Sequence, residues 1–219
     1  MKNARAFWNK SAARYAKSPI RDVSAYEKKL AITQKYLHPD SRVLEFGCGT
    51  GSTAIRHAPQ VREMVAIDIS DKMLEIAEQK ARDAGIENLT FRQGTLEEVE
   101  LEETSFDAVL GLNILHLLED LDATLARVHG LLKPGGVFVS NTVLIGDINV
   151  LFRMAIPPMQ VLGLAPYVNR FDKQTLVDKL IGAGFAIERE WQSGKATVFI
   201  VARKGRRSFP IKSRPGGRR

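Results

Sequence analysis

The feature that most constrains this fold is a glycine-rich loop directly after a short apolar run. Residues 42–46 are prone to form a β-strand, and Gly47, Gly49 and Gly51 follow at alternate positions. From Ser52 the pattern changes to helical spacing, which predicts that the glycines form a strand-to-helix turn. Glycine tolerates positive φ and lets a ligand approach the backbone. The loop therefore predicts a binding site for a polar or anionic group at the helix start.

Two acidic residues near this loop narrow the choice of ligand. Glu45 lies two residues before Gly47 on the same strand face, where a carboxylate favours a cationic ammonium over a phosphate. Asp68 ends a second apolar run, and an acid at this place accepts hydrogen bonds from ribose hydroxyls in nucleotide-binding α/β folds. The third glycine, Gly51, comes two positions after the second, whereas a nicotinamide-binding loop would have it at Ser52. The spacing thus argues against a dinucleotide.

Four motifs make the chain similar to a known family. They occupy residues 43–51, 66–73, 106–111 and 131–138. In this order and spacing they resemble the class I S-adenosylmethionine-dependent methyltransferases, especially the small-molecule type 11 group that includes ubiquinone and menaquinone methylases. The resemblance covers about residues 41–203. It implies an α/β, Rossmann-like fold with a seven-stranded, mostly parallel sheet, an antiparallel closing hairpin and helices on both faces.

The resemblance also implies S-adenosylmethionine as the cofactor. Glu45 and the glycine loop would hold the methionine part, and Asp68 would hold the ribose. Where the family commonly has an acid after the third strand to accept from the adenine amino group, this chain has Gly94-Thr95-Leu96, so the Thr95 hydroxyl or the Leu96 N–H would contact the adenine instead. The expected cofactor-binding residues are Glu45, Gly47, Cys48, Gly49, Gly51, Asp68, Ile69, Met73, Gly94, Thr95, Leu96 and Asn113.

Candidate acceptor contacts lie at the carboxyl ends of the later strands, where ligands bind in open α/β sheets. His116 could act as a general base if the accepting atom must lose a proton, and a buried, hydrogen-bonded His116 is an equal alternative. An apolar insertion at 147–170, with Arg153 and Tyr167 as polar anchors, predicts a lid over a hydrophobic acceptor or a contact between subunits. Tyr15 is a further candidate substrate residue.

The chain divides into three expected segments. Residues 1–40 form a helical leader that covers the cofactor pocket in the family, residues 41–203 form the methyltransferase domain, and residues 204–219 form a basic, disordered tail. An antiparallel hairpin is expected at the end of the domain, around the polar turn at 192–195. The expected helices are 4–17, 24–37, 70–84 and 121–132, and the later strands are 89–92, 106–111, 185–191 and 197–202.

The net charge of +7 is concentrated at the two ends of the chain. Residues 203–219 hold eight basic side chains and no acid, and residues 1–35 hold nine against two acids. A nucleic-acid track across the fold is not evident, so a nucleic-acid partner is disfavoured, although the basic ends could contact RNA or an anionic membrane. The single cysteine and the lack of an apolar signal segment predict a cytoplasmic protein. The sequence has no cluster of His, Asp and Glu at the spacing of metal ligands, so no metal is predicted.

The predicted function is methyl transfer from S-adenosylmethionine to a small, hydrophobic acceptor, with catalysis coming mainly from in-line positioning. Two alternatives stay open. A non-catalytic protein could bind the same cofactor to sense it or to scaffold a complex. A nicotinamide-dependent oxidoreductase shares the first half of the fold. Asp107 is expected to be a structural hydrogen-bonding residue, and Cys48 a small filler within the glycine loop.

Overall fold

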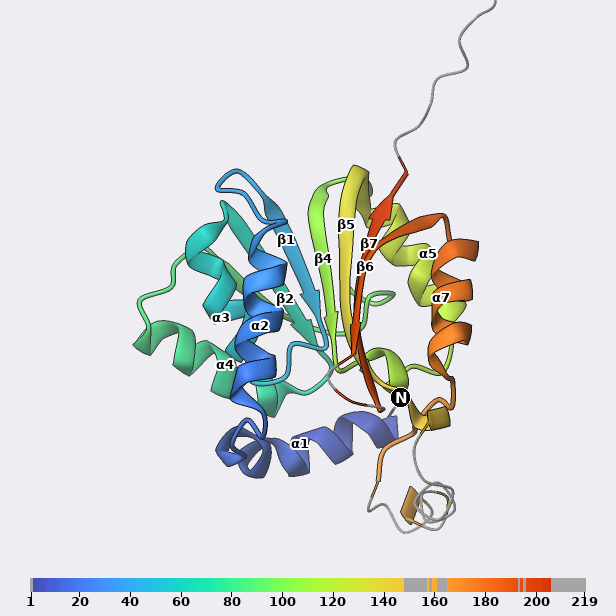
Figure 1. Cartoon of the computed structure of the whole chain (residues 1–219). Helices are drawn as coiled ribbons and strands as arrows, with labels where there is room; N and C mark the ends of the chain where they lie inside the picture. The colour runs from blue at the N-terminus through green and yellow to red at the C-terminus, as the bar shows by residue number, and fades with distance from the viewer. Residues whose placement is uncertain are drawn as a thin grey trace, which may run out of the picture.

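The computed structural model describes residues 2–147, 157, 159–160, 165–192, 194 and 196–205. A seven-stranded sheet runs through these residues in the order β3-β2-β1-β4-β5-β7-β6, with helices on both faces (Figure 1). The first five strands are parallel, and β7 is antiparallel to both of its neighbours, which confirms the expected sheet. The strands are β1 (Arg42–Phe46), β2 (Glu63–Asp68), β3 (Leu89–Gln93), β4 (Phe106–Leu112), β5 (Leu132–Val143), β6 (Phe185–Gln192) and β7 (Thr197–Lys204).

The helices cover the sheet in two layers. Residues of α5 and α7 pack on one face, and residues of α2, α3 and α4 pack on the other. None of the helices in the described part of the chain is long and apolar enough to cross a bilayer. The helices are α1 (Lys2–Lys17), α2 (Val23–Gln34), α3 (Ser52–His57), α4 (Asp71–Asp83), α5 (Leu121–Leu131) and α7 (Lys173–Gly182), with short 3-10 turns η1 (Ala58–Gln60), η2 (Leu115–Leu117) and η3 (Ile145–Asp147).

The central strands are apolar on both faces, as expected for a parallel sheet between two helical layers. In β1, Leu44 and Phe46 join the core beneath α5 and α7, whereas Val43 joins the core beneath α2 and α3. This alternation places Glu45 on the same face as Val43, at a position that the sheet buries almost completely. The polar side chains that belong to the central strands therefore lie mainly near the two ends of those strands.

Side-chain caps fix where the helices begin. The Ser70 hydroxyl accepts a hydrogen bond from the N–H of Met73 at 3.1 Å, and α4 starts at the next residue, close to the expected boundary. Asp172 caps α7 in the same way, through the N–H of Thr175. The helix α7 was not among those predicted from the sequence. At the end of the domain, β7 includes Lys204, one residue beyond the expected boundary at 203.

The insertion predicted as a lid at 147–170 lies for the most part outside the described residues, and so does Arg153. Its two ends are close together, because the Gly146 N–H donates to the Phe171 carbonyl at 3.2 Å. Residues 206–219 of the expected tail also lie outside the described part. In Figure 1, α1 runs along the lower edge of the molecule, where β1, β2 and β4 end.

Candidate functional site

The glycine loop forms a tight turn between β1 and α3. Gly51 has φ of 70°, and a Cβ at this position would lie 2.8 Å from the Cβ of Ala77 on α4. A side chain is therefore excluded both by the backbone conformation and by the close approach of α4. The loop is anchored to β2, because the Cys48 N–H donates to the Ile67 carbonyl at 3.0 Å. The predicted strand-to-helix turn is present.

Asp68 ties the end of β2 to the glycine loop. Its Oδ2 accepts the N–H of Gly49 at 2.8 Å, and its Oδ1 accepts the N–H of Ser70 at 2.9 Å. Burial raises the pKa of Asp68, while hydrogen bonds from backbone N–H groups partly oppose this shift. Each carboxylate oxygen has capacity for a further donor. Asp68 can thus accept ligand hydroxyls while it holds the loop in place.

Glu45 is a buried carboxyl group with an unsatisfied oxygen. The residue is 3% exposed, and its Oε2 has no hydrogen-bond partner among the described residues. Burial, followed by the nearby charge of Asp68, raises the pKa of Glu45 to about 8. A buried polar atom without a partner is costly, and a ligand cation would satisfy it. The residues present therefore fit the ammonium group of S-adenosylmethionine at Glu45 and its ribose at Asp68.

The helix α1 is fastened over this end of the sheet. Asn9 donates from Nδ2 to Oδ1 of Asp71 at 2.6 Å and accepts from the Ser70 hydroxyl at 2.6 Å. Tyr15 lies over the loop, with Cε1 3.7 Å from where a Cβ on Gly49 would be. Tyr15 is 48% exposed as a residue. Burial and then the charges of Asp68 and Glu45 raise the pKa of Tyr15.

The residues expected around the adenine lie beyond β2 and β3. Met73 and Leu96 are buried, at 2% and 3% exposure, and Ile69 is half-buried. Thr95 donates its N–H to Oε2 of Glu98 at 3.1 Å, and its hydroxyl accepts the N–H of Glu98 at 3.2 Å. Glu98 is thus an acid at this edge that was not predicted from the sequence. Its place three residues after Thr95 is the signal of a capping box.

A second polar cluster joins the ends of β4 and β5. Asn113 has φ of 59°, and its Oδ1 accepts from Nδ2 of Asn141 at 2.5 Å. Asn141 is 3% exposed, and its Oδ1 has no hydrogen-bond partner within the part of the chain that the structure describes. A role for Asn113 was predicted from the sequence, whereas Asn141 was missed. The contact joins residues 28 positions apart and depends on the register of β4 and β5, so no local pattern reveals it.

His116 belongs to the same edge of the sheet. Its Nδ1 lies 3.1 Å from the hydroxyl of Thr142, and burial lowers its pKa to about 4, so the ring is neutral at pH 7. The main-chain N–H of Asn169 donates to the carbonyl of His116 at 2.7 Å. Tyr167, two residues earlier, is 44% exposed. The described end of the insertion, residues 165–170, is therefore attached to the segment that carries His116.

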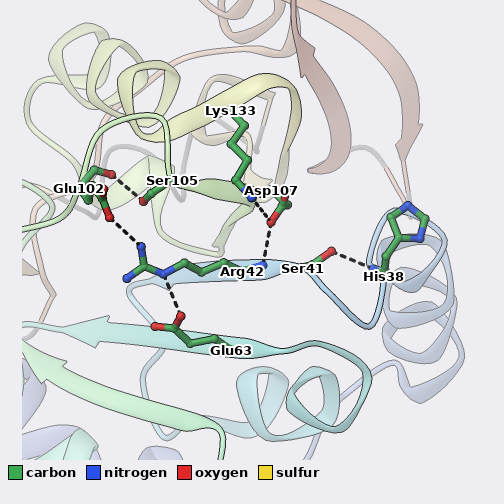
Figure 2. Close-up of polar contacts among 8 residues, drawn as sticks. All are labelled: His38, Ser41, Arg42, Glu63, Glu102, Ser105, Asp107 and Lys133. Atoms are coloured by element: carbon green, nitrogen blue, oxygen red, sulfur yellow. Dashed lines mark hydrogen bonds and ion pairs between the residues drawn. The ribbon is translucent and has the colours of Figure 1, made fainter.

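The opposite ends of the strands carry an ion-pair network, shown in Figure 2. The carboxylate of Asp107 accepts the main-chain N–H of Arg42 at 2.8 Å and contacts Nζ of Lys133 at 2.8 Å. Arg42 in turn pairs with Glu63 at 3.0 Å and with Glu102 at 3.4 Å. This network lies far from Asp68 along the strands and joins β1, β4 and β5. The structural interpretation of Asp107 is confirmed.

No group of three or more His, Cys, Asp or Glu side chains in the described part of the chain could hold a metal ion. Lys80 of α4 stabilises the glycine loop. Its Nζ donates to the carbonyl of Thr50 at 3.2 Å, to the Thr50 hydroxyl at 3.0 Å and to the Ser52 hydroxyl at 3.2 Å.

Comparison with known proteins identifies the family to which this chain belongs. Residues 37–159 match the model of a family described as a methyltransferase domain, which is more than half of the chain. The chain belongs to this methyltransferase family. The match covers the glycine loop, Asp68, Asn113 and His116, and it confirms the resemblance inferred from the four motifs.

Two curated relatives are similar over about half of this chain. The uncharacterized methyltransferase YcgJ of Bacillus subtilis is 34% identical over 100 residues, which cover 46% of this chain and 40% of YcgJ. The ubiquinone/menaquinone biosynthesis C-methyltransferase UbiE of Coxiella burnetii is 35% identical over 117 residues, which cover 51% of this chain and 46% of UbiE. The chain thus matches less than half the length of either relative.

A solved structure shares the fold over most of the chain. Phosphoethanolamine N-methyltransferase 2 of Haemonchus contortus, in complex with phosphomonomethylethanolamine and S-adenosylhomocysteine, superposes with a TM-score of 0.69. The alignment covers 83% of this chain and 53% of that chain, at 18% identity. The similarity supports the class I methyltransferase fold.

Proposed function

We propose that this protein binds S-adenosylmethionine between α1 and the carboxyl ends of β1 and β2, and transfers its methyl group to a small, hydrophobic acceptor. The observation that carries the proposal is the buried carboxyl group of Glu45, whose Oε2 has no partner, beside the carboxylate of Asp68. A cation and a pair of hydroxyls would satisfy these two groups together. The family match supports this choice over a nicotinamide cofactor.

The donor-binding roles follow from what each side chain can offer. Glu45 would pair with the ammonium, and Asp68 would accept the ribose hydroxyls through the free capacity of its two oxygens. Tyr15 of α1 would cover the site, since its ring lies close to Gly49. The cofactor supplies an electrophilic methyl group on a sulfonium. The chain needs to hold that methyl in line with the accepting atom and exclude water.

The acceptor would lie at the ends of β4 and β5. Asn113 and Asn141 present a paired amide surface there, and His116 offers Nε2 while Thr142 holds Nδ1. With a pKa of about 4, His116 is a weak base that is neutral at pH 7. An acceptor oxygen that has gained a methyl group is strongly acidic, so a weak base is enough to take its proton. His116 is therefore proposed to act after methyl transfer.

A hydrophobic acceptor is supported by the composition of residues 147–170, which are rich in Leu, Ile, Met and Phe with few charges. The relative UbiE bears a name from ubiquinone and menaquinone biosynthesis, which is consistent with an apolar acceptor class. We also propose a cytoplasmic location, because a single cysteine cannot form a disulfide within the chain, as is usual for proteins of reducing compartments.

The test is formation of S-adenosylhomocysteine from S-adenosylmethionine with a panel of hydrophobic phenols, quinols and lipids. Turnover above the rate without acceptor, lost in Glu45→Gln and kept in Glu97→Gln, is the expected result. Tight binding of the cofactor with no turnover on any acceptor would favour the non-catalytic alternative, a protein that senses the cofactor or scaffolds a complex.

A further inference from the structure

The outer face of α1 carries a row of cations that no acid balances. Lys10, Arg14 and Lys17 lie at i, i+4 and i+7, and Arg21 continues the spacing just beyond the helix. All four are exposed, and none has an ion-pair partner among the described residues. No acid occurs before Asp22, which caps α2 with its side chain. We call these four residues the basic row.

The opposite face of α1 packs against the rest of the protein. Ser11 and Ala12 are buried, at 8% and 2% exposure, and Asn9 is hydrogen-bonded to α4. Lys10 and Arg14 are each two residues from Ala12, which on a helix turns them to the far side. Lys10, Arg14 and Lys17 therefore lie on the outer side of α1, the helix that runs along the bottom of Figure 1, and Arg21 is exposed just beyond its end.

Apolar side chains stand exposed beside the end of this row. Ile20, in the connection between α1 and α2, is 47% exposed, and Val23, the first residue of α2, is 59% exposed. A hollow of about 510 Å³ is formed next to them by Ala13, Arg14, Lys17, Ser18 and Pro19. Two of its five lining residues are cations, so a phosphate-bearing group would be attracted to it.

We infer that the basic row, with Ile20 and Val23, is a surface that docks on an anionic lipid bilayer. Cations attract acidic headgroups, exposed aliphatic side chains enter the boundary of the acyl chains, and the hollow at Arg14 and Lys17 would take a headgroup phosphate. RNA would use the cations alone and leave the aliphatic side chains in water. The joint presence of both therefore favours a membrane surface.

Such docking would place the proposed active site at the bilayer. The inner face of α1 contacts the glycine loop through Tyr15 and the start of α4 through Asn9, and its outer face would rest on the headgroups. A hydrophobic acceptor could then pass from the bilayer to the site with little exposure to water. Only this last step rests on the proposed function, since docking itself requires neither the cofactor nor turnover.

The test is co-flotation of the full chain with vesicles of phosphatidylcholine alone and of phosphatidylcholine mixed with phosphatidylglycerol. Binding is expected only to the anionic vesicles. A lysine or arginine near such a surface contributes about a fivefold change in partition, so Arg14→Gln/Lys17→Gln should bind roughly 25-fold more weakly. The matched control is Lys35→Gln/Arg62→Gln, an equal charge change on exposed residues at the opposite edge of the sheet. It should bind like the wild type.

A second pair of variants tests the contribution of the exposed aliphatic side chains to vesicle binding. Ile20→Ser/Val23→Ser should weaken binding to anionic vesicles at least fivefold, whereas Ile181→Ser, an equally exposed aliphatic residue on α7, should have no effect. Equal losses in the control variants, or release of the protein from anionic vesicles by a short RNA, would overturn the inference. Affinity for S-adenosylhomocysteine, measured on every variant, reports separately on the donor site and on folding.

Discussion

The main-chain N–H of Gly49 donates a hydrogen bond to Oδ2 of Asp68 at 2.8 Å. The glycine loop and the acid at the tip of β2 are thus one unit, although 19 residues separate them in the sequence. Asp68 therefore serves two purposes. It holds the loop in its ligand-binding shape, and in the proposed function it offers its remaining acceptor capacity to the ribose.

Removing the Asp68 carboxylate should weaken donor binding severely. Asp68→Ala takes away the proposed ribose contacts and releases the N–H groups of Gly49 and Ser70. Hydrogen bonds to a charged group contribute about 1.5–3 kcal/mol each, so the Kd for S-adenosylhomocysteine should rise on the order of 100-fold by calorimetry. Asp83→Asn, at the exposed end of α4, is the control. Wild-type affinity in Asp68→Ala would contradict the assignment.

Glu45 should make the stability of the free protein fall with rising pH. Its pKa is about 8 in the folded chain and near 4.5 when unfolded, so the folded state binds more protons between these values. From pH 6.5 to 8 the free energy of unfolding should drop by roughly 1–2 kcal/mol in the wild type. In Glu45→Gln this decline should disappear, while exposed Glu97→Gln should keep it. Denaturant midpoints across this range supply the measurement.

The same residue should couple donor binding to a proton. At pH 7 a carboxyl with a pKa of about 8 is mainly protonated, and an ammonium beside it favours the charged form. Binding of S-adenosylhomocysteine should therefore release a proton, detected as a dependence of the binding heat on the ionisation enthalpy of the buffer. Glu45→Gln should bind at least tenfold more weakly and show no such dependence. Equal heats in all buffers for the wild type would argue against the ammonium pairing.

His57 should limit stability in acid. It is fully buried, and neither ring nitrogen has a hydrogen-bond partner in the described structure. Its pKa is lowered to about 4 by burial and then by the charge of Arg56. The unfolded state binds the proton more readily, so stability is lost as pH falls from 6.5 towards 4. His57→Leu should gain roughly 2–3 kcal/mol relative to the wild type between pH 7 and 4.5. The exposed control His38→Leu should not change the pH dependence of the denaturant midpoint.

Asp107 should matter for stability and not for the donor. Figure 2 shows it between the backbone of Arg42 and the side chain of Lys133, at the edge of the sheet away from Asp68. Asp107→Ala should lower the free energy of unfolding by about 1–2 kcal/mol, since it leaves an N–H and an ammonium without their acceptor. Affinity for S-adenosylhomocysteine should stay within twofold. A large loss of affinity with unchanged stability would show that Asp107 has a functional role.

The donor half of the site could be predicted from the sequence better than the acceptor half. Glycine spacing, Glu45 and Asp68 are local signals, because each lies at the end of an apolar strand and needs no tertiary information. Asn141 and Thr142 gain their roles only when β5 pairs with β4 and brings them to Asn113 and His116.

Two other features depended on tertiary contacts in different ways. Asn9 looks like an unfavourable residue within a helix until α1 packs against Ser70 and Asp71. The missed helix α7 did have a local signal, since Asp172 precedes Leu176 and Leu180 at helical spacing, and both leucines are fully buried. The cap and the buried face of α7 could therefore have been predicted from the sequence. The helix was missed because none of the four motifs includes it.

The most direct test of the central claim is isothermal titration of the purified chain with S-adenosylhomocysteine and S-adenosylmethionine, with NADH as the control ligand. We predict micromolar binding of both sulfur ligands and no binding of NADH, because Glu45 and Asp68 match an ammonium and a ribose at one site. Binding of NADH alone, or of none of the three ligands, would contradict that claim.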